Sequence, residues 1–361
     1  MSSNKKEFIN SPTFFVGVRG NGIISFGSGQ PDLPPPPQIY KILPEYHSFK
    51  YGLTQGQINL RKALAKQYSG ARPENFVITN GASEALDLTI RALSQKFGGG
   101  KLLLFRPYYY SYPFLVKLAG MEPVISDLKE GKIDLDDFKK KVKGCKAILI
   151  NSPSNPTGKI ESIETLKEIE KIAQKLGIYI LSDEVYKDLI YERENYLLHG
   201  PYVVTINSFS KTYAMCGFRV GYLYARDKDL VNRIVEIKAR TSMNTSILSQ
   251  EMAYEATKVP RNQVESQIKI WRQRRDMIYN GLKDLGFDLW KPEGAFYVFP
   301  KIKNSTQAVN DLFYKYKVIV YDGVWFGVPG RIRLSYAIDT EDIKEGLKRI
   351  KSYIGSKKGK I

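Results

Sequence analysis

Asn207–Tyr222 reads NSFSKTYAMCGFRVGY and places one lysine, Lys211, among small hydroxyl residues, with Arg219 eight positions later. A short apolar run, Tyr202–Ile206, leads into this segment, and a second run, Val220–Tyr224, leaves it. We expect both runs to be buried strands. A lysine on a loop is usually a solvated surface residue, but a lysine held between buried strands must be paired, neutral or covalently used. Lys211 is therefore a candidate imine-forming lysine, weighed against an ordinary surface lysine.

The bulk composition limits the classes of function. The chain has 361 residues, 43% of them hydrophobic and 25% charged, which is ordinary for a globular protein with a large and a smaller domain. No apolar run has the length of a membrane span, and residues 1–10 lack the apolar core of a signal peptide. Two cysteines without a CxxC pair fit a reducing compartment, and two histidines are too few for a conventional metal cluster. We therefore expect a cytoplasmic protein without a metal.

The net charge of +18 favours anionic partners such as nucleic acid or phosphorylated ligands. The basic residues are spread, however, and dense blocks occur only at Lys139–Lys141, Arg272–Arg275 and Lys357–Lys360. A solvated, lysine-rich surface is therefore the preferred interpretation, with a nucleic-acid site as the alternative.

Short apolar runs alternate with helical patterns over the first two-thirds of the chain. Besides the two runs around Lys211, strands are predicted at residues 77–79, 101–105, 123–126, 147–151 and 178–182. This alternation predicts a doubly wound α/β domain with a mostly parallel sheet, in which ligands bind at the carboxyl ends of the strands. Asn155, Asp183, Tyr186, Ser208 and Lys211 all fall at that edge.

The C-terminal third predicts a smaller α+β domain. A long amphipathic helix is expected from about Val264 to Leu285. It is followed by predicted strands at Gly294–Phe299, Lys317–Tyr321 and Gly330–Ala337, and by a last helix over Thr340–Ile354. We expect residues 31–263 to form the large domain, and residues 1–30 with residues 264–361 to form the small one.

Two glycine turns are candidate ligand contacts. Gly81, Ala82 and Ser83 lie between a predicted strand and a predicted helix, where free N–H groups and the helix dipole form an anion site. Simple capping by Asn80 or Ser83 explains the same pattern. Gly29 precedes a proline-rich stretch and suits a close approach of the backbone to a ligand, although a plain turn explains it equally well.

The residues near Lys211 suit an aromatic aldehyde with a ring nitrogen. A lysine that forms an imine needs a carbonyl partner and must be able to lose its proton. Asp183 is placed to hold a positive pyridine nitrogen, and Tyr186 with Asn155 to hydrogen-bond a phenolic oxygen. Tyr109, in a loop that follows a predicted strand, is a candidate for stacking on the ring.

The remaining residues suit a phosphate and a carboxylate. Ser208, Arg219 and the turn at residues 81–83 are candidates for a phosphate. A separate arginine in the small domain would bind a carboxylate as a planar fork. Together these features match pyridoxal phosphate, an aldehyde that acts as an electron sink and is anchored by its phosphate.

Nearly the whole chain resembles the class I/II aminotransferases, which are pyridoxal-phosphate enzymes of fold type I. The motifs occur in the family's order and are, together, highly specific: Gly29–Asp32, Tyr51 with Gly56, Gly81, Pro107–Tyr109, Asn155–Gly158, Asp183–Tyr186, Ser208–Lys211 with Arg219, Gly294–Tyr297 and Arg333–Ala337. The resemblance implies ping-pong transfer of an amino group between an L-amino acid, such as aspartate or an aromatic amino acid, and a 2-oxo acid such as 2-oxoglutarate.

The resemblance also implies a role for each matched residue. Lys211, Asp183 and Tyr186 would be catalytic, with Lys211 bonded to the cofactor and moving the proton of the substrate. The implied cofactor contacts are Gly81, Ala82, Ser83, Tyr109, Asn155, Asp183, Tyr186, Ser208, Lys211 and Arg219. Tyr51 would reach the phosphate of a partner subunit, which implies a homodimer with shared sites.

The implied substrate contacts are Gly29, Asn155 and Arg333. Arg331 lies two residues earlier on the same expected strand face and competes for the substrate carboxylate. Arg333 is preferred because it lies four residues before Ala337, as the arginine of the family does.

Two positions depart from the family pattern and bear on the substrate. Tyr109 stands where related enzymes often have tryptophan, and Asp322 replaces a proline. Side-chain specificity is expected to depend on Tyr109 and on Phe14, Phe15, Val18 and Trp325. A lyase or decarboxylase on the same scaffold is the enzyme alternative, and a regulatory or nucleic-acid-binding relative is the non-enzyme alternative.

Overall fold

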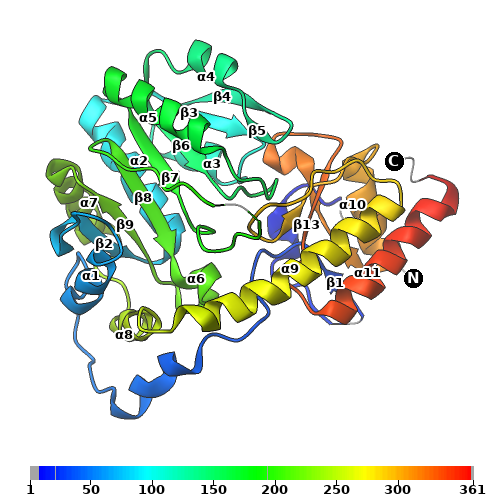
Figure 1. The fold of residues 1–361 in the computed structure, drawn as a ribbon, viewed down its shortest axis with the longest axis horizontal. Helices are drawn as coiled ribbons and strands as arrows, with labels where there is room; N and C mark the ends of the chain where they lie inside the picture. Colours follow the sequence, from blue (N-terminus) through cyan, green and yellow to red (C-terminus); the bar gives the residue numbers. More distant parts are fainter. Residues whose placement is uncertain (1–7, 21, 193, 359–361) are drawn as a thin grey trace, which may run out of the picture.

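A sheet of eight strands forms the centre of the larger part of the protein (Figure 1). The structure is a computed structural model and describes residues 8–20, 22–192 and 194–358. The strands lie in the order β2 (Phe76–Thr79), β9 (Gly221–Ala225), β8 (Val203–Ser208), β7 (Tyr179–Asp183), β6 (Cys145–Asn151), β3 (Lys101–Arg106), β4 (Glu122–Lys129) and β5 (Lys132–Ile133). Neighbours from β8 to β4 are parallel, whereas β2, β9 and β5 pair antiparallel. The predicted mostly parallel α/β sheet is thereby confirmed.

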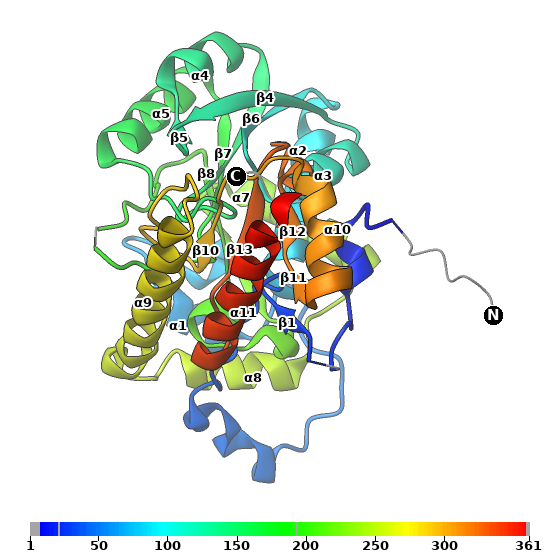
Figure 2. The same cartoon turned by 90° about the vertical axis from the view of Figure 1, so that its right-hand side faces the viewer.

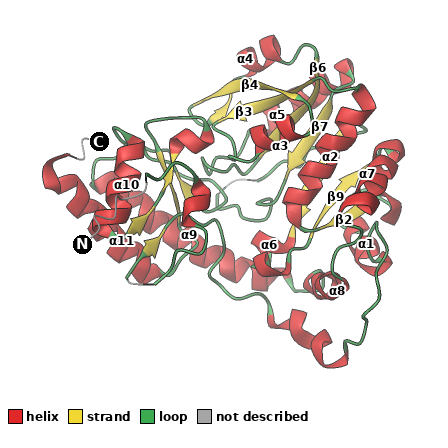
Figure 3. Cartoon of the chain, turned by 180° about the vertical axis from the view of Figure 1, so that it is seen from behind, coloured by secondary structure: helices red, strands yellow, loops and turns green. Residues whose placement is uncertain are grey.

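Both faces of this sheet are apolar, because successive side chains of a strand point to opposite faces. In β3, Leu102 and Leu104 belong to the core on one face, and Leu103 and Phe105 to the core on the other. Helices therefore cover both faces (Figure 3). They are α1 (Ile58–Ala65), α2 (Gly81–Phe97), α3 (Tyr112–Leu118), α4 (Leu135–Lys141), α5 (Ile163–Leu176), α7 (Lys228–Thr241) and α8 (Ile247–Ala256).

Local signals explain where the helices begin and end. The hydroxyl of Ser162 accepts a hydrogen bond from the Thr165 N–H and caps the start of α5. Gly177 ends α5 with a φ of +64°, a conformation that suits glycine. α7 and α8 lie outside the elements that the sequence patterns predict, although Leu230, Val231 and Ile234 of α7 recur at helical spacing and are buried.

Within the described residues, the smaller part contains two short sheets and three α-helices. β10 (Tyr297–Val298), β13 (Ile332–Ser335) and β12 (Tyr321–Asp322) form an antiparallel sheet, and β1 (Ile24–Ser25) pairs in parallel with β11 (Val318–Ile319). The helices α9 (Arg261–Asp284), α10 (Ser305–Tyr316) and α11 (Thr340–Tyr353) lie side by side (Figure 2). The pairing of β1 with β11 joins the N-terminal segment to the C-terminal region.

Two predicted strands of this part are wrong in extent. Lys317–Tyr321 is not one strand, because Ile319 pairs with β1 while Tyr321 pairs with Arg333 in the other sheet. Val318, Ile319 and Val320 are all buried, so an apolar run gives no sign of the change of sheet. Gly294–Phe299 contains only the two-residue β10, since Ala295 has a φ of +53° and breaks the extended backbone.

In Figure 1, α9 runs from the region of α8 and α6 (Phe209–Thr212) in the larger part to the small sheets of the smaller part. It begins three residues before the predicted start and buries Trp271 and Ile278 in the core of the smaller part. No helix within the described ranges is both long and apolar enough to cross a membrane.

Gly346 in α11 tests the contact between the N-terminal segment and the last helix. A methyl group at this position would collide with the ring of Phe26, which is fully buried after β1. We expect Gly346→Ala to lower the free energy of unfolding by about 1–3 kcal/mol, measured by urea denaturation, although alanine normally favours a helix.

The matched control is Gly355→Ala, where nothing lies within 4 Å of the added methyl group. This control should change the free energy of unfolding by less than about 1 kcal/mol. Equal stability of the Gly346→Ala variant and the native protein would contradict the close packing of Phe26 on α11.

Candidate active site

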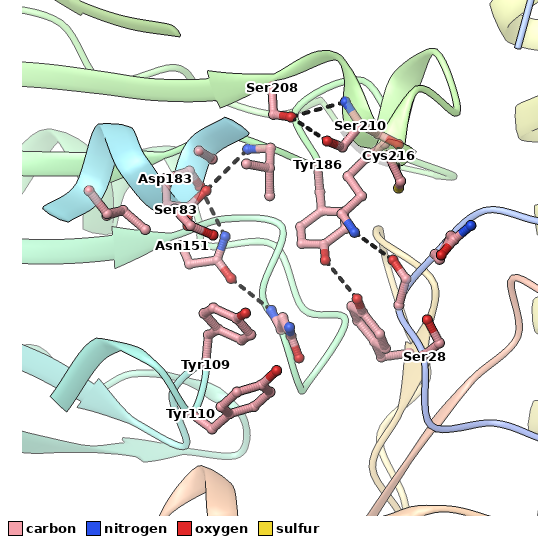
Figure 4. A pocket seen from close by; sticks show the side chains of 18 of the residues that line it. Ser28, Ser83, Tyr109, Tyr110, Asn151, Asp183, Tyr186, Ser208, Ser210 and Cys216 are labelled. Carbon is pink, nitrogen blue, oxygen red and sulfur yellow. Dashed lines mark hydrogen bonds between the residues drawn. The ribbon is translucent and has the colours of Figure 1, made fainter. Parts of the chain in front are cut away.

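A cavity of about 450 Å³ lies at the carboxyl ends of the central strands, where it is also bordered by the smaller part (Figure 4). Most of the predicted site residues line it: Gly29, Ala82, Ser83, Tyr109, Asn155, Asp183, Tyr186, Ser208, Lys211, Arg219 and Arg333. They come from segments far apart in the sequence. The topology brings them together because parallel strands end at the same edge of the sheet.

Lys211 lies on α6, a single turn that directly follows β8. Ser208 starts this turn by accepting a hydrogen bond from the Ser210 N–H at 3.0 Å. Lys211 Nζ donates to the carbonyl oxygen of Gly29 at 2.5 Å. Burial lowers the pKa of Lys211, and the positive charges of Arg333 and Arg219 act in the same direction. The amine therefore loses its proton more readily than a surface lysine, as a nucleophile must.

Asp183 ends β7 and is buried beside the same cavity. Its Oδ2 accepts a hydrogen bond from the hydroxyl of Tyr112 at 2.6 Å, and its Oδ1 accepts one from the Val185 N–H at 3.3 Å. Burial raises the pKa of Asp183 to about 6, against the effect of these hydrogen bonds and of Lys211. The carboxylate is thus charged at neutral pH in a place where a cationic partner would stabilise it.

Tyr186 and Gly29 meet at Tyr297. The hydroxyls of Tyr186 and Tyr297 are 2.7 Å apart and hydrogen-bonded. A methyl group at Gly29 would collide with the Tyr297 hydroxyl, so this position requires glycine. Gly29 thus lies close to a side chain of the same protein, and its carbonyl accepts the hydrogen bond from Lys211.

The start of α2 has the properties of an anion site. The side chain of Asn80 does not cap α2; its Nδ2 and the Asn80 N–H both donate to Glu84 instead. Capping by Asn80 is thus wrong as an explanation of this turn, and the N–H groups of Ala82 and Ser83 remain directed at the cavity end of the helix. Gly81 has a φ of +76°, which suits glycine.

Arg219 adds a permanent charge at the same place. Its Nη1 donates to the Cys216 carbonyl at 3.0 Å, and its Nη2 lies 3.4 Å from the Asn80 carbonyl. Gly221 lets β9 approach closely, because a methyl group there would lie 2.7 Å from the carbonyl carbon of Gly81. The hydroxyl of Ser208, expected to bind phosphate, bonds within its own turn to Ser210.

Arg333, rather than Arg331, lines the cavity. Arg333 Nη1 donates to Asn155 Oδ1 at 3.0 Å and Nη2 donates to the Gly27 carbonyl, while the buried Nε has no partner. Arg331 instead donates to the Phe299 carbonyl and stacks on Trp290 at 4.0 Å. Of the two arginines that compete in the sequence for the substrate carboxylate, only Arg333 therefore borders the cavity.

Several predicted residues lie outside the cavity. Tyr51 is 83% exposed and borders a separate surface hollow with Phe49 and Ile247. Four residues expected to influence specificity do not line the cavity: Phe14, Phe15, Val18 and Trp325. Phe15 and Trp325 pack against Tyr321, which does line it. Asp322 accepts hydrogen bonds from Ser305 and Thr306 and has a structural position.

The cavity also contains residues that the sequence patterns did not identify. They include Tyr110, Tyr112, Asn151, Cys216 and Tyr321. Asn151 Nδ2 donates to the Asp183 carbonyl at 3.0 Å, and Asn151 Oδ1 accepts from the Asn155 N–H at 2.8 Å. Asn151 ends a predicted strand, so the same strand-end rule that selected Asp183 identifies it. In Figure 4, Tyr109 and Tyr110 lie at one end of the cavity, and Ser208 and Ser210 at the other.

The sequence and the fold of this chain both match those of known aminotransferases. Residues 21–350 match the family model for aminotransferases of class I and II. A probable aspartate aminotransferase of Methanocaldococcus jannaschii is 36% identical over 349 residues, which cover 91% of this chain and 92% of that protein. The crystal structure of an aspartate aminotransferase from Thermotoga maritima matches with a TM-score of 0.89 and 29% identity, covering 98% of this chain and all of that one. An aromatic aminotransferase from Pyrococcus horikoshii matches with a TM-score of 0.87 and 29% identity, covering 96% and 100%.

Gly81 provides a test of the anion site. A methyl group at Gly81 would lie 2.5 Å from Arg219 Nη2 and displace the guanidinium. We expect Gly81→Ala to weaken the binding of inorganic phosphate to the ligand-free protein about tenfold or more, measured by isothermal titration calorimetry, since hydrogen bonds to a charged ligand are lost.

Gly98→Ala is the matched control, at the other end of the same helix. Gly98 also has a positive φ, +67°, but nothing lies within 4 Å of an added methyl group. Both variants therefore carry similar backbone strain, and only Gly81→Ala should lose phosphate. An equal loss in both variants would show that strain, and not the position of Arg219, explains the effect.

Proposed function

The chain belongs to the class I and II aminotransferase family and is an aminotransferase, and from that premise we propose that pyridoxal 5′-phosphate is its cofactor. One observation carries this proposal. A lysine with a lowered pKa, Lys211, lies in one cavity with a buried carboxylate, Asp183, and with the uncapped start of α2. A covalent anchor, a partner for a pyridinium nitrogen and a phosphate site are thus within one cavity.

The residues present fit the phosphate and the ring of this cofactor. We assign the phosphate to the N–H groups of Ala82 and Ser83 with Arg219, and Ser208 is kept as a further candidate contact. When bound, pyridoxal phosphate would supply an aldehyde for the amino group and a ring that accepts an electron pair.

Four side chains are assigned to the ring. Asp183 would keep the ring nitrogen protonated through its charged carboxylate. Tyr186 and Asn155 would hydrogen-bond the phenolic oxygen, and Tyr109 would stack on the face of the ring. Tyr186 is already held by Tyr297 at 2.7 Å, which orients its hydroxyl before any ligand binds.

Lys211 is assigned two tasks, which both need a neutral amine. It would bond to the cofactor at rest, and its Nζ would move a proton between the α-carbon of the substrate and the cofactor. In the ligand-free structure, the hydrogen bond from Nζ to the Gly29 carbonyl holds the amine inside the cavity.

Arg333 is assigned to the α-carboxylate of the substrate. Arg333 is 2% exposed, and its guanidinium carbon lies 4.5 Å from the ring centroid of Tyr297 and 4.7 Å from that of Tyr321. Its buried Nε has no hydrogen-bond partner. A buried, unpaired donor is costly unless a ligand satisfies it. Asn155 Oδ1 orients the guanidinium by accepting a hydrogen bond from Nη1. The backbone at Gly29 would complete the carboxylate site.

The tyrosines that line the cavity give information on the side chain of the substrate. Tyr109, Tyr110 and Tyr321 form a wall beside Arg333, and the cations among the described lining residues are Lys211, Arg219 and Arg333. Each of these cations already has a task. We propose aspartate or an aromatic amino acid as the donor and 2-oxoglutarate as the acceptor, and the tyrosine wall favours the aromatic donor.

We also propose a homodimer with shared sites, in which Tyr51 reaches the phosphate of the partner. Large apolar side chains are exposed around it, with Phe49 at 88% and Leu53 at 56%. Such an exposed apolar surface is typical of a protein interface. A cytoplasmic location is proposed because Cys145 and Cys216 are free thiols.

We also propose a division of the chain into two domains. Residues 31–263 would form the cofactor-binding domain, and residues 1–30 with residues 264–361 the small domain. The pairing of β1 with β11 supports the union of the two small-domain segments. The boundary after residue 263 falls in the first turn of α9, which begins at Arg261.

The Lys211→Ala variant tests the assigned reaction. We expect the native protein to convert 2-oxoglutarate to glutamate with an aromatic amino acid or aspartate as donor, and the variant to lose at least about 100-fold in rate. The exposed Lys269→Ala serves as the control and should retain full activity. Release of ammonia, pyruvate or carbon dioxide in place of a 2-oxo acid would contradict amino transfer by this chain.

Mixed dimers test the role of Tyr51. Lys211→Ala and Tyr51→Ala subunits should each be impaired alone, whereas co-refolding them in equal amounts should restore about a quarter of the native sites, because half of the dimers are hybrids with one intact site. Activity of the separated and mixed proteins is compared at equal concentration. If Tyr51 acts within its own subunit, mixing restores nothing.

A further inference from the structure

Tyr112 joins two residues that the proposed function assigns to the same ring. It is the first residue of α3 and is buried, with 3% of its surface exposed. Its hydroxyl donates to Asp183 Oδ2 at 2.6 Å. Because β6 lies between β3 and β7 in the sheet, this bond links the loop after β3 to the end of β7 across an intervening strand.

The ring of Tyr112 contacts the predicted stacking residue. It meets Tyr109 edge to face, with centroids 5.4 Å apart and an interplanar angle of 79°. The Tyr112 N–H also donates to the Tyr109 carbonyl at 2.9 Å. The Tyr112 side chain therefore contacts both residues: Asp183, assigned to the nitrogen of the cofactor ring, and Tyr109, assigned to its face.

The other contacts of Asp183 leave this carboxylate dependent on Tyr112. The Val185 N–H is 3.3 Å from Oδ1, a long hydrogen bond, and Asn151 contacts only the main-chain carbonyl. A carboxylate accepts more hydrogen bonds than these two, so capacity remains for a ligand. Lys211 across the cavity is the charged group that acts on it, and the adjacent Glu184 has its own partners, the hydroxyls of Ser182 and Thr205.

The charge state of Asp183 depends on the same contact. Burial raises its pKa to about 6, and the Tyr112 hydroxyl opposes this rise by bonding to the charged form. Without that donor the protonated carboxyl would persist to higher pH, and Asp183 would be a weaker partner for a cation.

We propose that Tyr112 is a positioning residue for the cofactor: its hydroxyl fixes and holds the Asp183 carboxylate for the ring nitrogen, and its ring holds Tyr109 against the ring face. This inference rests on the proposed cofactor. It assigns to Tyr112 no contact with the reacting atoms.

The experiment compares two ligands that differ only at the ring nitrogen. Ligand-free protein is titrated with pyridoxal 5′-phosphate and with its deaza analogue, in which a C–H replaces the nitrogen, and Kd is measured by tryptophan fluorescence at neutral pH. Tyr112→Phe keeps the ring and removes the donor. We expect its Kd for pyridoxal phosphate to rise about tenfold, as for a lost hydrogen bond to a charged group, with the Kd for the analogue unchanged.

The matched control is Tyr179→Phe. Tyr179 is buried at the start of the same strand, β7, and its hydroxyl donates to the carboxylate of Asp227, away from the cavity. This variant should bind both ligands as the native protein does. Tyr112→Leu, which also removes the ring that holds Tyr109, should weaken both ligands.

The outcomes separate this inference from the proposed function. If Tyr112→Phe binds both ligands normally, or loses both equally, the positioning role is overturned while the cofactor stands. If the native protein binds neither ligand, the cofactor and the inference fall together. Should Tyr112→Phe fail to fold, 3-fluorotyrosine at position 112 makes a stronger donor of nearly the same shape and should tighten pyridoxal phosphate about twofold; no change would overturn the inference.

Discussion

The site depends on a backbone contact between Gly221 on β9 and the turn at Gly81. Any side chain at Gly221 would strike the main chain of Gly81 and Ala82. This contact places the start of α2, with its unpaired N–H groups, next to the loop that carries Lys211 and Arg219. The antiparallel pairing of β9 with both β2 and β8 enforces it, since Thr79 and Ser208 are both opposite Gly221.

The burial that follows from this arrangement determines the electrostatics. A lysine and an aspartate are both removed from water, so the pKa of Lys211 falls and that of Asp183 rises. Neither group is compensated by a direct ion pair with the other. Each is instead held by a neutral partner, the Gly29 carbonyl and the Tyr112 hydroxyl. A bound cofactor that carries both an aldehyde and a ring nitrogen would engage both groups at once.

Residues at strand ends were predictable, and residues that depend on packing between distant segments were not. The position of Asp183 after an apolar run is enough to place it at the ligand edge of a parallel sheet. Tyr112 belongs to a helix, and only the three-dimensional order β7, β6, β3 brings it to Asp183. The residues themselves left Arg331 and Arg333 in competition, and only the family pattern favoured Arg333, because the stacking of Arg331 on Trp290 has no local signal. The change of sheet after Ile319 is hidden for the same reason, within an unbroken apolar run.

The pairing of β1 with β11 also constrains the order in which the chain acquires its structure during synthesis. Ile24 pairs with Val318, so the N-terminal strand has no partner until nearly the whole chain has left the ribosome. The eight-stranded sheet, complete by residue 225, can form earlier from segments closer in sequence. The Lys211 amine meets the Gly29 carbonyl only after this late pairing places the segment that follows β1. The sequence separation of its strands thus allows the large sheet to form before the segment at Gly29 reaches Lys211.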